Sequence, residues 1–378
     1  MRVLITGIVR RSKCDEPSGY VYEVDLDAAE QVAMAPTPES EHLKQNRNPR
    51  GGLRGGRGMA IWRDCLCISN TDAIWVYDTE WRVQRIIHHS GCARVHDIAV
   101  YEDKLYVTSS ANDQVFVFTF DGEVDSILTP RDNADLLKEL EVKISRKHAL
   151  SREDLRAGRI DFSDPTAFRL DDYDRMHLNS VCVSGTGVVT VSLGRMLPLH
   201  MNLLLDVKDF LNRVGLYEHL ITASKTLRRV LGVKAKQNSD IGIVLQNAAS
   251  ALARRDAEGQ WSLFNRFDKT AVPNHSLKCW NDATLLYCDT NHGDLLFIDT
   301  ETGAICERMF VASEFLRGLC VIDRSTALVG SQNCLYQVDL TERRILRKIE
   351  VSTDKRLSIY DVIVIPDAFA PLPSHLPV

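Results

Sequence analysis

Hydrophobic and polar residues alternate in short runs along much of the chain. One stretch shows the unit clearly, because four such runs follow one another with Asx and glycine turns between them. They are residues 96–101 (HDIAVY), 104–110 (KLYVTSS), 114–120 (QVFVFTF) and 123–128 (EVDSIL). A period of two is typical of strands with one buried face, and short turns join neighbouring strands in antiparallel order. This stretch therefore predicts a four-stranded antiparallel sheet.

The same four-run pattern recurs several times along the chain. Complete copies begin at Arg57 (RGMAIWR), at Asn274 (NHSLKCW) and at Arg317 (RGLCVID), and an interrupted copy begins at Asn179 and resumes near residues 250–267. A sixth copy is split, with YDVIVIP at residues 360–366 and three further runs between residues 2 and 36. Four-stranded repeats that close a ring through the two chain ends leave no open sheet edge. We predict an all-β, six-bladed β-propeller that forms a single domain over residues 1–378.

Two intervals between repeats are about twice the usual blade length and indicate insertions. One covers residues 129–176 and includes the helical pattern ADLLKELEVKI; the other covers residues 195–249, where apolar residues recur at three-to-four spacing. A shorter insertion covers residues 35–56. All three connections emerge at one face of a propeller, so we expect the two long ones to form a lid with helical segments at the mouth of the central funnel. The alternative is that they cover an apolar patch or a dimer interface.

Composition restricts the class of protein. The 378 residues are 44% hydrophobic and 26% charged, which is typical of globular proteins rather than disordered ones. The net charge of −5 and the absence of a long apolar run argue against nucleic-acid and membrane partners. The ten cysteines fall mostly inside apolar runs and contain no CxxC pair, which favours free thiols in a reducing compartment. We therefore expect a cytoplasmic protein, whose oligomeric state the sequence does not specify.

The first residues of the innermost strands should point into the funnel. Alignment of the six repeats places these residues at one equivalent position: Arg57, His96, Asn179, His275, Arg317 and Tyr360. His177 lies two residues before Asn179, so an extended strand would point it the same way. We expect His96, His177 and His275 to bind a divalent transition metal, because neutral imidazole suits Fe, Cu, Zn or Mn better than Ca²⁺. A polar channel without metal and a metal-free acid/base site are the alternatives.

The remaining polar residues at the funnel suggest roles beside that metal. Asp97, Asp361 and Tyr360 are the expected catalytic or orienting groups. Substrate-binding roles are expected for Arg57, Arg317, Asn179 and Arg195, since arginines bind carboxylates and phosphates bidentately. The alternative is that these arginines pair with the neighbouring acidic residues.

The phrases Pro273–Ser276 (PNHS) and Arg317–Leu319 (RGL), with the strands that follow them, resemble six-bladed propellers of the gluconolactonase/regucalcin, NHL-repeat and strictosidine-synthase-like group. They are most similar to an uncharacterised bacterial propeller family that repeats Pro-x-His-Ser and Arg-Gly-Leu phrases in successive blades. The resemblance covers the blades and not the insertions, and it implies the fold. Regucalcin-like enzymes hold an axial metal with Glu, Asn and Asp; the resemblance implies such places for Asn179 and Asp361, but histidines stand where the acidic and amide partners would be expected.

From these observations we predict a metal-dependent enzyme that acts on a small polar, anionic substrate at the propeller axis. Its chemistry is left open between hydrolase or lyase reactions and oxidative reactions. The rival prediction is a non-catalytic propeller that binds a protein or carbohydrate partner through its helical insertions.

Overall fold

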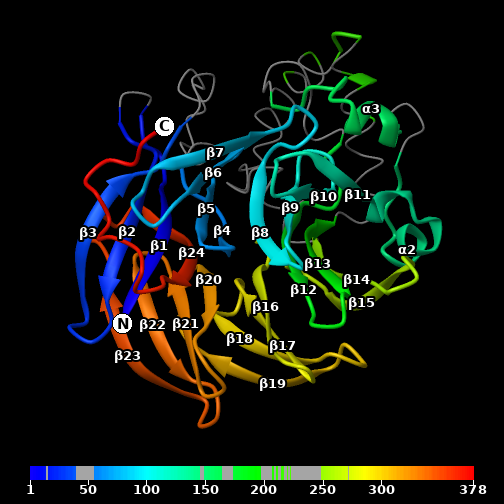
Figure 1. Ribbon diagram of the computed structural model, residues 1–378. Helices are drawn as coiled ribbons and strands as arrows, with labels where there is room; N and C mark the ends of the chain where they lie inside the picture. Colours follow the sequence, from blue (N-terminus) through cyan, green and yellow to red (C-terminus); the bar gives the residue numbers. More distant parts are fainter. Residues whose placement is uncertain are drawn as a thin grey trace.

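The strands of the computed structural model form six antiparallel four-stranded sheets arranged as a ring (Figure 1). The structure describes residues 1–13, 16–39, 55–144, 149–163, 173–196, 248–270 and 272–378, with isolated positions between 207 and 222. The six blades and the split sixth repeat predicted from the sequence are confirmed. In the described part of the chain, no helix is long and apolar enough to cross a membrane.

Blades are numbered here from the first complete repeat. Blade 1 contains β4 (Met59–Trp62), β5 (Cys65–Ser69), β6 (Ala73–Tyr77) and β7 (Val83–His88). Blade 2 contains β8 (Val95–Tyr101), β9 (Lys104–Ser109), β10 (Gln114–Thr119) and β11 (Val124–Leu128). Blade 3 contains β12 (Leu178–Val183), β13 (Val189–Met196), β14 (Ala249–Arg255) and β15 (Trp261–Phe267).

The other three blades complete the ring. Blade 4 contains β16 (His275–Asn281), β17 (Thr284–Asp289), β18 (Asp294–Asp299) and β19 (Ile305–Phe310). Blade 5 contains β20 (Leu316–Val321), β21 (Thr326–Ser331), β22 (Cys334–Asp339) and β23 (Arg344–Glu350). Blade 6 contains β24 (Leu357–Val364), β1 (Arg2–Val9), β2 (Gly19–Asp25) and β3 (Glu30–Pro36). Each blade begins with its innermost strand, and these six strands neighbour one another around the axis.

Blade 6 closes the ring because its innermost strand comes from the far end of the sequence. β24 pairs with β1 in antiparallel register, from Val3 opposite Val364 to Val9 opposite Leu357. Figure 1 shows this red strand beside the blue ones. The segment after β24 then packs over blade 1, where Phe369, Leu372 and Leu376 are buried. Pairing through both ends satisfies the backbone groups that an open edge would expose.

Hydrophobic cores lie between the blades rather than within any one of them. Each pair of adjacent blades shares a cluster of buried side chains, such as Trp62 and Phe116 between blades 1 and 2 or Tyr287 and Leu252 between blades 3 and 4. Alternation along each strand produces this arrangement, because one face packs against the preceding blade and the other face against the following one. The tight turns between strands are held by aspartates: Asp299 accepts backbone N–H groups of Glu301 and Thr302.

The first insertion contributes short helices at the outer edge of the ring. It contains η1 (Pro130–Asp132), α2 (Ala134–Glu139) and α3 (Arg152–Arg156), and Asn133 and Ser151 cap the two α-helices. α2 contacts the outermost strand β15 and α3 contacts the outermost strand β11 (Figure 1). Most of the second insertion, residues 197–247, lies outside the described residues, so the lid expected there stays a prediction.

A second ring of residues, each one position after the funnel residues, ties neighbouring blades together. Its members are Gly58, Asp97, Ser180, Ser276, Gly318 and Asp361. Asp361 accepts the N–H of Met59, and Asp97 accepts the N–H of Val181. Ser180 Oγ accepts the N–H of Ser276, whose own Oγ accepts the N–H of Gly318. Buried donors at the start of successive inner strands are thereby satisfied across the blade boundaries.

Gly58 occupies a point in this second ring where two blades approach too closely for a side chain. A Cβ on Gly58 would lie 2.7 Å from the backbone nitrogen of Ile98 and 2.9 Å from the Cα of Asp97. We expect Gly58→Ala to lower the free energy of unfolding by about 1–3 kcal/mol, as overpacking does. The measurement is urea unfolding beside Gly185→Ala, where a Cβ meets nothing within 4 Å. Equal effects of the two substitutions would contradict the close approach.

Candidate active site at the propeller axis

Irregularities in the inner strands direct the predicted residues into the funnel. The register of β8 shifts between Val95 and Ile98, that of β12 between Leu178 and Ser180, and that of β20 between Leu316 and Leu319. Residues inside such a bulge leave the ladder, and a bulge re-aims their side chains. Four of the six residues aligned from the sequence lie inside such irregularities, while His275 is paired just before one and Arg57 precedes β4. The six are called the axial ring below: Arg57, His96, Asn179, His275, Arg317 and Tyr360.

Tyr360 contacts three other members of the axial ring. Its hydroxyl accepts a hydrogen bond from Arg57 Nη1 at 2.6 Å and donates to His96 Nδ1 at 2.7 Å. The guanidinium carbon of Arg317 lies 3.2 Å from the centroid of the tyrosine ring, and Arg317 Nη2 also donates to His96 Nδ1, at 3.2 Å. Stacking on an aromatic face suits a planar guanidinium. Four residues from four blades therefore form one contiguous polar network.

These contacts determine the protonation of His96. Its Nδ1 accepts from two donors, so its Nε2 carries the proton and the ring is neutral. Burial, together with Arg57, His177 and Arg317, holds the pKa of His96 well below its ordinary value. His96 is therefore a neutral N–H donor at neutral pH rather than a lone-pair donor.

His177 forms a carboxylate–histidine pair with Asp174. His177 Nδ1 lies 3.0 Å from Asp174 Oδ2, and the Asp174 side chain is only 1% exposed. Burial alone would raise the pKa of Asp174, but His177, Arg195 and Arg94 outweigh it and hold the pKa below its usual range. An ionised Asp174 orients the imidazole with its proton on Nδ1, which leaves a lone pair on Nε2. This is the arrangement of a general base.

The segment that carries His177 is held by Asp113 at the end of the β9–β10 turn. Its carboxylate accepts the backbone N–H groups of Arg175, Met176 and Leu178. His177 itself has φ of 53°, so it lies in the left-handed region, and β12 begins only at Leu178. The prediction that an extended strand directs His177 is therefore wrong. A turn fixed by Asp113 brings the ring to 4.9 Å from that of His96, centroid to centroid.

His275 and Asn179 line the same cavity. Thr290 donates its hydroxyl proton to the carbonyl of Leu316, so its oxygen accepts from His275 Nδ1 at 3.2 Å. Burial and Arg317 hold the pKa of His275 well below its usual value, and the ring is neutral. Asn179 Nδ2 donates to the carbonyl of Asn274, while the buried Oδ1 of Asn179 has no hydrogen-bond partner within the described ranges.

Asp97 and Asp361 lie with Lys278 deeper in the channel. Lys278 Nζ is 3.6 Å from Asp97 Oδ1, and Asp97 and Asp361 outweigh burial to raise the pKa of Lys278. Burial raises the pKa of Asp361 to about 6. Both carboxylates also hold the backbone of the next blade. These contacts give the two aspartates a structural role, and the catalytic role expected from the sequence stays a prediction.

The transition-metal site expected at the three histidines stays a prediction, because donors already occupy the lone pair of one of the three rings. Their rings are neighbours, with His96 and His275 stacked at 6.4 Å between centroids. However, His96 has its lone pair on Nδ1, where Tyr360 and Arg317 donate to it, and the adjacent guanidinium repels a dication. Across the described residues, no group of three or more His, Cys, Asp or Glu side chains is placed to hold a metal ion. His96 and Arg317 therefore suit an anion, whereas His177 and His275 each keep a lone pair on Nε2.

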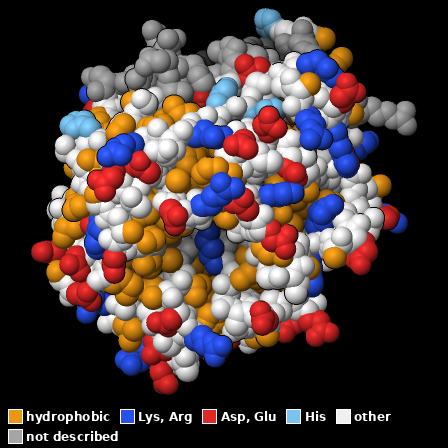
Figure 2. Space-filling model, in the orientation of Figure 1, with side chains coloured by type: hydrophobic (Ala, Val, Ile, Leu, Met, Phe, Trp, Pro, Cys, Tyr) orange, Lys and Arg blue, Asp and Glu red, His pale blue; other side chains and the backbone are white. Residues whose placement is uncertain are grey.

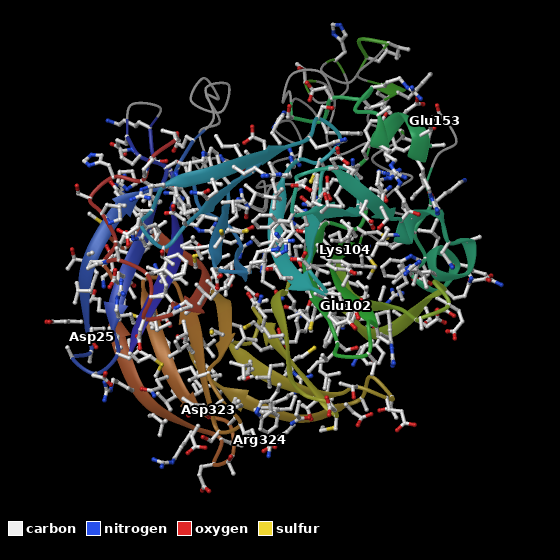
Figure 3. The ribbon with its side chains drawn as sticks, viewed as in Figure 1. Asp25, Glu102, Lys104, Glu153, Asp323 and Arg324 are labelled. Atoms are coloured by element: carbon white, nitrogen blue, oxygen red, sulfur yellow. The ribbon has the colours of Figure 1, made fainter. Side chains whose placement is uncertain are left out.

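The axial cavity is small and polar. It is lined by residues of both rings together with Lys278, and its free space is about that of one water molecule. Figure 2 shows a hollow near the middle of the viewed face with a lysine or arginine side chain in it. Figure 3 labels Glu102 in the β8–β9 turn and Asp323 and Arg324 in the β20–β21 turn, where two of the inner strands end.

The axial ring was predicted from the sequence, but the residues that position its side chains were not. Arg195 lies near Asp174 and influences its pKa, and its backbone N–H donates to Met176, so it lies beside the His177 pair. Asp113, Asp174 and Lys278 were not predicted. The sequence signal for Asp174 is its place three residues before His177. It falls in the lid predicted from the sequence, within the acidic tract 169–174. Residues 169–172 of that tract lie outside the described residues.

Comparisons with known proteins support the fold. No protein-family model and no curated protein matches the sequence. A chain from the crystal structure of a nidogen/laminin complex aligns over 96% of this chain and 97% of that one, with a TM-score of 0.52 and 8% identity. A Bacteroides caccae protein of unknown function aligns over 96% and 97%, with a TM-score of 0.51 and 10% identity. A streptogramin B lyase aligns over 80% of this chain and 70% of its own, with a TM-score of 0.42 and 9% identity. At these identities the likeness to solved structures identifies the β-propeller fold alone.

Proposed function

We propose that the mouth of the axial ring binds a small anionic substrate and that His177 transfers a proton to or from it. The observation that carries this proposal is Arg317. Its side chain is buried, at 5% exposure, and no carboxylate lies within ion-pair distance of it in the described part of the chain. A buried charge without a counter-ion is costly, so an arrangement of this kind is typical of anion binding.

The neighbouring residues supply complementary chemistry. Arg57 and Arg317 flank Tyr360 and would hold a carboxylate or phosphate group. The neutral N–H of His96 would donate to an oxygen on which charge develops, and His177 Nε2, oriented by Asp174, would act as the base. Since the cavity itself holds about one water, the substrate would bind at its mouth. The reaction class is proton-transfer chemistry, namely hydrolysis or elimination.

Two finer expectations from the sequence belong to the same proposal. We infer kinship with the gluconolactonase/regucalcin, NHL-repeat and strictosidine-synthase-like group, for which the support is the propeller fold and the PNHS and RGL phrases. We also infer a cytoplasmic location, supported by nine free cysteines among the described residues.

The anion site is tested by calorimetry with a panel of small carboxylates and phosphates. We expect Arg317→Met to weaken binding of the best anion by about tenfold to a hundredfold, because a charge-assisted contact is lost from a buried position. The matched control is Arg63→Met, which removes an exposed arginine paired with Asp103 and should leave binding unchanged. Failure of every anion to bind, or equal binding by Arg317→Met, would contradict the proposal.

A further inference from the structure

The innermost strands of blades 3 and 4 bring two cysteine thiols into direct contact. Cys182 on β12 and Cys279 on β16 are 97 residues apart in sequence, and their sulfur atoms are 2.7 Å apart. A disulfide bond is about 2.05 Å long, so little movement separates the two thiols from a bond. The contact joins different blades and is independent of the anion site proposed above.

We propose that Cys182 and Cys279 form a reversible disulfide that cross-links blades 3 and 4 when the protein meets a hydroperoxide. The rest of the molecule contains no comparable pair among its described cysteines, all of which are free thiols. Cys279 is partly exposed, whereas Cys182 is 7% exposed. A peroxide would therefore reach Cys279 first.

The surroundings give the two thiols different roles. The hydrogen bond from Cys182 and the ammonium group of Lys278 lower the pKa of Cys279. The same hydrogen bond, with burial, raises the pKa of Cys182. A thiolate is the nucleophilic form of cysteine, and it is favoured beside a lysine. Cys279 is thus the thiol that is oxidised, and Cys182 is the thiol that resolves it.

The chemistry needs only the peroxide as oxidant. The Cys279 thiolate attacks one peroxide oxygen, an S–O bond forms, the O–O bond breaks, and hydroxide leaves and takes up a proton to give water. The Cys182 sulfur then loses its proton and attacks the Cys279 sulfur. An S–S bond forms, the S–O bond breaks, and a second water leaves. Two thiols are oxidised and one peroxide is reduced, and a thiol reductant reverses the change.

The test treats reduced full-length protein with about one equivalent of hydrogen peroxide and measures its intact mass. We expect the protein to become about 2 Da lighter and digestion without reductant to yield a linked Cys182–Cys279 peptide pair. The bond closes a long loop, so the midpoint of thermal unfolding should rise by several degrees and return after treatment with dithiothreitol.

Serine variants separate this pair from general thiol oxidation. Cys182→Ser should lose no mass and instead leave a sulfenic acid on Cys279 that dimedone traps, whereas Cys279→Ser should give neither product. Cys320→Ser is the matched control, because Cys320 is a partly exposed thiol on the innermost strand of blade 5 whose sulfur contacts a carbonyl rather than a thiol. It should behave like wild type. No mass loss in the wild type, the same loss in folded Cys279→Ser, or a link to another cysteine would overturn the proposal.

Discussion

Lys278→Met is expected to lower the free energy of unfolding by about 3 kcal/mol at pH 7, which is the lower end of the range for breaking a buried ion pair. The substitution keeps most of the packing of the side chain but leaves Asp97 and Asp361 without the cation that faces them. The low end applies because a quarter of the Lys278 side chain is exposed. Urea unfolding followed by circular dichroism gives the measurement.

The loss should depend on pH in a defined direction. Burial raises the pKa of Asp361 to about 6, above the value of about 3.9 for an unfolded aspartate. A carboxyl group with a raised folded pKa stabilises the fold at low pH, and that stability is lost as pH rises through the folded pKa. Without Lys278 the pKa rises further, so the deficit of the variant should be larger at pH 8 than at pH 5.

The matched control for Lys278 is a lysine in an exposed ion pair. Lys104, labelled in Figure 3, lies 2.9 Å from Asp125 with 42% of its side chain exposed. Lys104→Met should change the free energy of unfolding by less than about 1 kcal/mol, because solvent screens such pairs. A Lys278→Met protein that is as stable as Lys104→Met at pH 8 would show that the two buried aspartates do not depend on the lysine.

Asp174→Asn is expected to lower kcat by about 10²- to 10⁴-fold on any substrate that the anion panel leads to, while KM changes little. An amide cannot stabilise the charge that His177 acquires, and it can turn its N–H₂ toward Nδ1 and select the wrong tautomer. Asp174 contacts the Nδ1 side of His177, and the His177 ring neighbours that of His96. The substitution should therefore affect proton transfer by His177 rather than anion binding.

Steady-state kinetics and calorimetry together check this second expectation. The control is Asp125→Asn, which removes the partly exposed partner of Lys104 and should leave both constants unchanged. An unchanged kcat, or a loss confined to KM, would remove His177 from the proton-transfer role. Weakened anion binding by Asp174→Asn would mean that the turn held by Asp113 had moved.

The fold could be predicted from the sequence because every blade carries the same local pattern of strands and turns. Alternation specifies the strands, aspartate turns join them, and the split repeat at residues 2–36 and 360–366 specifies the closure. The axial ring followed from alignment of the repeats, since equivalent positions in a ring face the same axis. None of this requires knowledge of how one blade contacts the next.

The residues that position the site's side chains could not be predicted, because they act through contacts between blades that no local pattern encodes. His96 is neutral because Tyr360 and Arg317, from other blades, donate to one of its nitrogens. His177 depends on Asp113, which is 64 positions earlier and acts through backbone N–H groups rather than through a motif. Bulges in the inner strands also override the period of two. The three histidines near the axis suggested a metal, whereas the hydrogen bonds that reach His96 from other blades make it a neutral N–H donor, which suits an anion.

The pairing of β1 with β24 also sets an order of events during synthesis. β1 is synthesised before blades 1 to 5 and its partner β24 after them, so blade 6 lacks its innermost strand while those blades are being made. Contacts between such distant residues form slowly, and an unpaired strand edge exposed in the meantime invites association between chains. Nascent protein should therefore depend on chaperones until residues 357–364 emerge, and conditions that slow translation just before these residues should reduce the yield of soluble protein.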